Sequence, residues 1–148
     1  MRIAIGSDHA GFLYKQALVE HLKKQGIEVL DVGTTSQEST DYPTYAFRVA
    51  TSVQEHLSDA GVLICGTGIG MSIAANKVKG IRAGAVQSAF AAQAIKEHND
   101  ANVICVGSRT NTLPEVISFV DVYLKSHFLG GDRHSRRIEL ISKYEGGN

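Results

Sequence analysis

A glycine-rich turn after an uninterrupted apolar run is the segment best suited to chemistry. Residues 65–72 read Cys-Gly-Thr-Gly-Ile-Gly-Met-Ser, with three glycines at alternating positions and a short helix expected from about Met71. Consecutive N–H groups in such a turn can converge on an anion, helped by the positive end of the helix. The spacing differs from the GxGxxG of a dinucleotide-binding turn, and no P-loop lysine follows. We expect an anion-binding loop, with a purely structural tight turn as the alternative.

Cys65 is the candidate reactive group of this loop. The adjoining N–H groups would stabilise a thiolate. The loop lacks the arginine that a phosphatase-type nucleophile needs, so the thiolate would suit a general base that removes a proton from a carbon beside a carbonyl. The amides would then stabilise the enediolate oxygen that forms. The alternative is a small core residue, which is the role we expect for Cys105.

The histidines divide into two groups. His9 and His98 are expected at catalytic ends of the sheet, beside the polar residues Asp8 and Asn99. Three others are expected to be solvated surface groups on amphipathic helices: His21, His56 and His127.

A basic cluster near the C-terminus contains the sixth histidine. Arg133, His134 and Arg137 share one helical face, whereas Arg136 is less clearly part of it. The helix dipole disfavours cationic side chains in a first helical turn. Their presence there therefore indicates a bound anion, such as a phosphate. A solvated helix start is the alternative.

Alternating strands and helices must position these residues. Strands are expected at 2–6, 27–32, 60–65, 82–86 and 102–106, and helices at about 12–24, 43–57, 88–97, 112–127 and 133–144. This alternation predicts parallel pairing and a three-layer α/β/α sandwich, and the nearly all-apolar strands agree with a sheet covered on both faces. Ligands in such folds bind beyond the carboxyl ends of the strands. Asp8, Cys65 and Arg109 follow three of those ends.

The composition excludes several classes of protein. A length of 148 residues suits one domain, and 15 basic residues balance 15 acidic ones, which argues against a nucleic-acid binder. No apolar run reaches the roughly 18–20 residues of a membrane span, and the start is no signal peptide. Two cysteines forty positions apart favour neither a disulfide framework nor a metal site. We expect a cytoplasmic protein.

Five motifs resemble the ribose/galactose isomerase family, which includes allose-6-phosphate and galactose-6-phosphate isomerases. They are IGSDHAGF at 5–12, DYP at 41–43, CGTGIGMSIAANK at 65–77, EHNDAN at 97–102 and RHSRR at 133–137. The resemblance spans essentially the whole chain, in order. It implies one Rossmann-like domain over residues 1–148, with a five-stranded parallel sheet in the order 2-1-3-5-4.

The resemblance also implies an activity. The family interconverts an aldose phosphate and a ketose phosphate through a cis-enediolate, without metal or organic cofactor. Members with a cysteine at the position of Cys65 use it as the base that moves a proton between C1 and C2. Other members carry serine there and use an acidic residue a few positions later as the base. Residues 73–75 contain no carboxylate, so this chain resembles the cysteine type. The expected substrates are ribose 5-phosphate and ribulose 5-phosphate.

Individual roles follow from the same resemblance. His98 would open the furanose ring, and the sugar hydroxyls would be held, or their protons relayed, by Thr67, Asp8 and Asn99. The enediolate hole would be formed by the amides of Gly66, Thr67, Gly68, Ile69, Gly70, Met71 and Ser72. Tyr42 would line the sugar site. The phosphate clamp would consist of His9, Arg133 and Arg137, with His134 and Arg109 as further members.

The family's subunits are at least dimeric, and each of its sites takes residues from two chains. We therefore expect a homodimer or tetramer, with the helix from about residue 133 contributing to the site and the dimer. A hexose-6-phosphate isomerase is the alternative within the same chemistry. A non-catalytic sugar-phosphate sensor is the alternative from another class, although a sensor would not need Cys65, Thr67 and His98 together.

Overall fold

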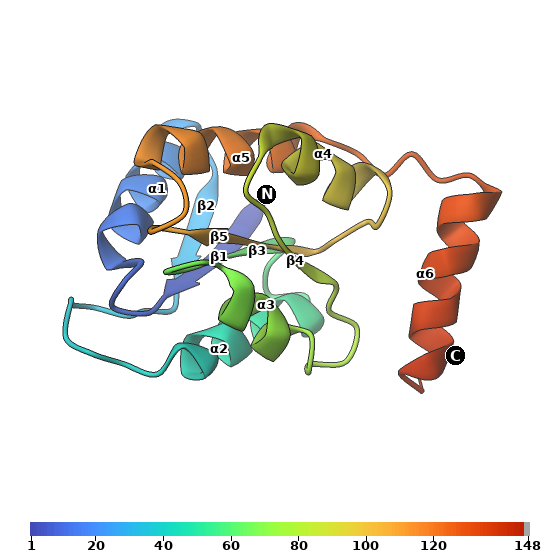
Figure 1. The fold of residues 1–148 in the computed structure, drawn as a ribbon, viewed down its shortest axis with the longest axis horizontal. Helices are drawn as coiled ribbons and strands as arrows, with labels where there is room; N and C mark the ends of the chain where they lie inside the picture. Colours follow the sequence, from blue (N-terminus) through green and yellow to red (C-terminus); the bar gives the residue numbers. More distant parts are fainter. Residues whose placement is uncertain (147–148) are drawn as a thin grey trace.

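The computed structural model describes residues 1–146, and the last two residues of the predicted domain lie outside this range. Strands and helices alternate within it, as predicted (Figure 1). The strands are β1 (Arg2–Ser7), β2 (Glu28–Asp31), β3 (Ala60–Cys65), β4 (Ala83–Ala85) and β5 (Val103–Gly107). The helices are α1 (Phe12–Lys24), α2 (Tyr42–Gln54), α3 (Ile69–Ala75), α4 (Ala89–Glu97), α5 (Leu113–Lys125) and α6 (Asp132–Tyr144).

The sheet is parallel throughout and has the order β2-β1-β3-β5-β4, which confirms the predicted fold. β1 lies between β2 and β3, with Ser7 in register with Ile64. β3 in turn pairs with β5, where Cys65 is in register with Gly107. The segments that follow β1, β3 and β5 therefore leave the same edge of the sheet side by side.

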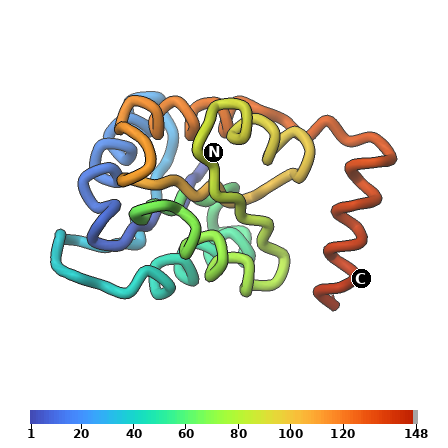
Figure 2. The backbone as a smooth tube through the Cα atoms, in the orientation of Figure 1, coloured from blue at the N-terminus to red at the C-terminus, as the bar shows by residue number. Residues whose placement is uncertain are grey.

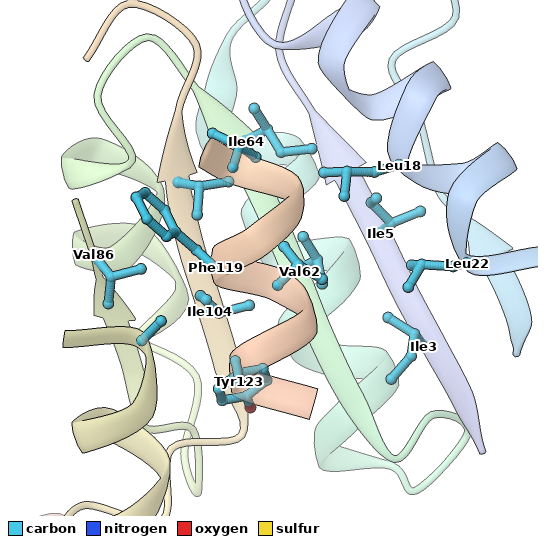
Figure 3. Packing of buried hydrophobic residues seen from close by; sticks show 14 of the residues in the cluster. Ile3, Ile5, Leu18, Leu22, Val62, Ile64, Val86, Ile104, Phe119 and Tyr123 are labelled. Atoms are coloured by element: carbon cyan, nitrogen blue, oxygen red, sulfur yellow. The ribbon is translucent and has the colours of Figure 1, made fainter. Parts of the chain in front are cut away.

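Helices cover both faces of the sheet, with α1, α4 and α5 on one side and α2 and α3 on the other (Figure 1). Successive strand residues point to opposite faces. In β3, Val62 and Ile64 join the cluster that contains Leu18 and Phe119 (Figure 3), whereas Leu63 joins the cluster on the opposite face. Burial on both faces explains why the central strands are apolar without alternation.

Local capping signals formed where the sequence predicted them. Thr112 and Glu115 make a reciprocal capping box at the start of α5, with N–H···O distances of 2.9 and 3.3 Å. The Ser88 hydroxyl accepts a hydrogen bond from the Ala91 amide at 3.1 Å and caps α4. These bonds satisfy amides that have no partner inside the helix.

Several element boundaries differ from the prediction by one to three residues, among them the end of α5, which lies at Lys125 rather than near residue 127. α2 ends at Gln54 rather than near residue 57, because His56 adopts a left-handed φ of 59° that cannot continue the helix. α3 begins at Ile69 rather than Met71, directly after Gly68. β4 at the sheet edge covers only three residues.

His21 is a correction to the predicted surface histidines. It is half-buried, and its Nε2 atom lies 2.9 and 3.0 Å from the two carboxylate oxygens of Asp121. The pair joins α1 to α5 across 100 positions of sequence. His56 and His127 are exposed, as expected, but they lie beyond the ends of α2 and α5 rather than on these helices.

Helix α6 stands apart from the rest of the molecule (Figures 1 and 2). None of its residues is buried, and Leu140, Ile141 and Tyr144 are exposed by 60%, 54% and 96%. Beyond its end, the Glu145 carboxylate accepts a hydrogen bond from the Gly80 amide at 2.9 Å. Apolar side chains that an amphipathic helix leaves in water are typical of a surface for association. Among residues 1–146, no helix has the length and apolar character needed to cross a membrane.

Candidate active site

The loop after β3 places an amide against the sulfur of Cys65. Cys65 is only 6% exposed, and the Gly68 N–H donates to its Sγ atom at 3.1 Å. Gly68 adopts a φ of +79°, and a Cβ there would lie 3.0 Å from backbone atoms of Cys105 and Val106. Only glycine fits both the conformation and the space. The loop therefore holds the sulfur beside a backbone donor, as an anion-binding loop requires.

The segment after β5 lies against the same loop. The amides of Ser108 and Arg109 donate to the carbonyls of Cys65 and Gly66, both at 2.9 Å. A Cβ on Gly66 would lie 3.3 Å from Cδ and 3.4 Å from Nη1 of Arg109. Arg109 thus brings a permanent positive charge to the rim of the cysteine loop.

Tyr42 also lies against this loop. A Cβ on Gly70 would come within 2.7 Å of the Tyr42 ring, so this glycine lets the ring lie directly against the backbone. Thr67 Oγ1 accepts a hydrogen bond from the Ile69 amide at 3.2 Å, and the Ser72 hydroxyl donates to the Ile69 carbonyl at 3.0 Å. The Met71 side chain is fully buried, so only its backbone can serve the site.

Asp8 and His9 follow β1 at the same edge of the sheet. The buried Asp8 carboxylate accepts a hydrogen bond from the Gly11 amide at 3.1 Å, and the Asp8 amide donates to the Ile64 carbonyl at 3.3 Å. The Thr40 amide donates to His9 Nδ1 at 3.2 Å. This bond leaves Nε2 as the His9 nitrogen that can donate to a ligand.

A second group of predicted residues gathers around the end of α4. The rings of His98 and His134 stack with centroids 4.7 Å apart and 9° between their planes. Partial desolvation and the charges of His98, Arg133 and Arg137 hold the pKa of His134 below its usual value. The Asn99 carbonyl accepts a hydrogen bond from Arg82 Nε at 2.9 Å. Cationic and aromatic groups of α4 and α6 therefore form one cluster.

These two groups lie at opposite edges of the sheet within one chain. Cys65 ends β3, whereas Asn99 is bound by Arg82, which precedes β4. A helix that starts at the carboxyl edge of a parallel sheet ends at the amino edge. The prediction that His98 shares a strand-end location with His9 is therefore wrong for a single chain. Figure 1 shows α6 on the far side of the molecule from the turn between β1 and α1.

Two features were not foreseen from the sequence. One is Arg82, which was predicted only as the start of a strand. The other is a cavity of about 560 Å³ at the end of β2, where the buried Lys15 Nζ lies 2.6 Å from Asp31. Sequence patterns within one helix or strand could not predict either contact, because the partners lie 16 to 18 positions apart.

Within residues 1–146, no cluster of three or more His, Cys, Asp or Glu side chains has the arrangement of a metal site.

Fold and loop together define a doubly wound α/β protein with a cysteine at the switch point of its sheet. Residues 3–141 match the family described as Ribose/Galactose Isomerase. The chain is 48% identical to ribose-5-phosphate isomerase B of Escherichia coli K12, over 97% of this chain and 96% of that protein. It belongs to the ribose/galactose isomerase family and is an isomerase.

Solved structures agree over the whole fold. Ribose-5-phosphate isomerase B of Clostridium thermocellum superimposes with a TM-score of 0.97 at 46% identity, covering 99% of this chain and 98% of that one. The Mycoplasma genitalium ribose-5-phosphate isomerase B, solved with bound ribulose-5-phosphate, gives a TM-score of 0.94 at 45% identity, covering 99% and 97%.

Proposed function

We propose that this protein interconverts ribose 5-phosphate and ribulose 5-phosphate, with Cys65 as the general base. The observation that best supports this proposal is the 3.1 Å hydrogen bond from the Gly68 amide to the Cys65 sulfur at the end of β3. It places a potential thiolate in a loop of backbone donors. The named activity of the relatives at 45–48% identity and the ribulose-5-phosphate complex of one of them support the substrate.

The reaction begins with ring opening, for which His98 is the acid–base group, and Asn99 holds a hydroxyl. The Cys65 thiolate then takes the proton from C2 of the open-chain aldose. The C2–H electron pair becomes the C1=C2 double bond, and the carbonyl pair moves to O1. The loop amides stabilise this cis-enediolate oxygen.

Product formation needs two proton movements. The O2 proton passes to O1, with Thr67 and Asp8 as the relay. The Cys65 thiol then returns its proton to C1, which leaves a carbonyl at C2 and regenerates the thiolate. No atom or electron is gained or lost, so the reaction is an isomerisation.

The two groups of site residues come together between two copies of the chain. The cluster of His98, Arg133 and Arg137 lies too far around the sheet to serve Cys65 of its own chain. In a symmetric dimer, the cluster of each subunit would complete the partner's site. The exposed apolar side chains of α6 supply a surface for that contact. A cytoplasmic location suits this mechanism, since the base must stay a reduced thiol.

The test is a coupled assay of ribulose 5-phosphate formation by the purified protein. We expect turnover of ribose 5-phosphate and much lower kcat/KM on allose 6-phosphate and galactose 6-phosphate. Cys65→Ser should be strongly impaired, since a hydroxyl has no accessible anion near neutral pH. Cys105→Ser is the matched control and should retain activity. Binding of sugar phosphate without turnover would instead identify a sensor, and full activity of Cys65→Ser would remove the proposed base.

A further inference from the structure

We propose that Arg82 is a positioning residue that holds the turn carrying His98 and Asn99 in the orientation needed for ring opening. This inference rests on the proposed function. Arg82 precedes β4, and nothing in the local sequence links it to the site.

The Arg82 side chain binds this turn through its planar guanidinium. Nε donates to the Asn99 carbonyl at 2.9 Å, and Nη2 donates to the Asp100 carbonyl at 2.8 Å. Nη2 also lies 3.5 Å from the Asp100 carboxylate. Two consecutive carbonyls are thus held by one rigid fork. A lysine has a single point charge and cannot reproduce this geometry.

The turn is one that requires support. Asp100 has a φ of 44°, a left-handed conformation that is unfavourable for a residue with a side chain. Lys96 Nζ lies 2.6 Å from the Asp100 carboxylate. From α5, the buried Tyr123 hydroxyl donates to the Ala101 carbonyl at 2.6 Å. Contacts from α4, from α5 and from the residue before β4 therefore determine the path of the backbone directly after His98.

These contacts act on one half of the site only. His98 is the C-cap residue of α4 and stacks on His134, so its ring follows any shift of the backbone at Asn99 and Asp100. Cys65 and its amide loop lie at the opposite edge of the sheet and do not contact Arg82. A displaced turn should impair ring opening and closure while leaving proton transfer at C1 and C2 intact.

Deuterium exchange separates these two steps. Ribulose 5-phosphate is acyclic, because its C5 oxygen carries the phosphate, so Cys65 can exchange a C1 proton with D2O without any ring step. The measurement is deuterium in recovered ribulose 5-phosphate, by NMR, relative to ribose 5-phosphate formed. For Arg82→Lys we expect kcat on ribose 5-phosphate to fall about tenfold, since a small misplacement of a reacting group is costly. KM should change less than about twofold, and the exchange-to-conversion ratio should rise about tenfold.

The matched control is Arg2→Lys. Arg2 lies at the same edge of the sheet, where it binds Glu28 at 2.6 Å and the Leu57 carbonyl at 3.3 Å, away from the turn. The Arg2→Lys variant should leave kcat and the exchange-to-conversion ratio unchanged. Lys96→Met removes one cation from Asp100 without disturbing β4 and should shift the ratio in the same direction as Arg82→Lys. Guanidinium chloride at millimolar concentration should partly restore Arg82→Ala.

The outcomes discriminate between roles. A fall in kcat with an unchanged exchange ratio in both Arg82→Lys and Lys96→Met would show a merely structural role and overturn the inference. Unchanged kcat in both would do the same. If Arg82→Ala does not fold, Arg82→Lys and Lys96→Met still decide the question. A wild-type enzyme that neither isomerises nor exchanges would overturn the proposed function itself, and this inference with it.

Discussion

His98 and His134 stack with their ring centroids 4.7 Å apart and their planes 9° from parallel. This contact joins the end of α4 to the first turn of α6, although the two helices are separated by β5 and α5 in the sequence. The group proposed for ring opening and the α6 part of the proposed phosphate clamp therefore form one unit, whereas His9 of the clamp follows β1 at the edge of the sheet that holds Cys65. If that unit completes the site of a second subunit, ring opening and phosphate binding are delivered together.

Subunit mixing tests the shared site. At ribose 5-phosphate concentrations below the wild-type KM, Cys65→Ala should be inactive and Arg137→Ala severely impaired, and activity should return when the two are mixed. Each heterodimer would hold one site with both lesions and one with neither. Random exchange would leave about a quarter of all sites intact. No recovery after verified subunit exchange would place both residues in the same chain's site.

The two cysteines should differ in reactivity toward iodoacetamide at neutral pH. Burial raises the pKa of the Cys105 thiol, and this side chain is fully buried in β5. Cys65 lies at a strand end beside the Gly68 amide, so it should be labelled much faster, and ribose 5-phosphate should protect it. Peptide mapping after partial inactivation locates the label. Activity that falls in step with labelling of Cys105 would contradict the proposed base.

Arg137→Ala should raise KM by more than it lowers kcat. A charge-assisted contact to a phosphate that does not react acts equally in the ground and transition states. Steady-state kinetics on ribose 5-phosphate provides the measurement, with the neighbouring Arg136→Ala as control. An unchanged KM for Arg137→Ala would remove this residue from the clamp.

Gly68→Ala should destabilise the protein and impair the site. Both the left-handed φ of +79° and the 3.0 Å approach to Cys105 and Val106 oppose a Cβ at this position. The backbone conformation alone should cost about 1–3 kcal/mol of the free energy of unfolding. Gly80→Ala is the matched control, because Gly80 has a φ of +83° and open space around it.

Chemical denaturation and the isomerase assay together check this expectation. Gly80→Ala should lose stability but keep its activity per folded molecule, whereas Gly68→Ala should lose more of both. Equal effects of the two substitutions on stability and activity would show that close packing at Gly68 is unimportant.

Much of the architecture follows from local sequence. Apolar strand runs require cover on both faces, and the Thr112–Glu115 box starts α5 through bonds within one turn. The cysteine loop is also local, since Cys65 and Gly68 are three positions apart. Such features depend on neighbouring residues, so their physics is present in the sequence itself.

Tertiary structure alone decided how distant parts meet. The sequence identified His98 and Cys65 as candidate catalytic residues. Because α4 runs back across the sheet, however, the two residues lie at opposite edges of it. His21 appeared to be a solvated helix residue until α5 brought Asp121 within 2.9 Å. Arg82 likewise gained its contacts from the packing of β4 beside the α4 turn. These relationships depend on which elements become neighbours in space, and side-chain spacing along one element contains no such information.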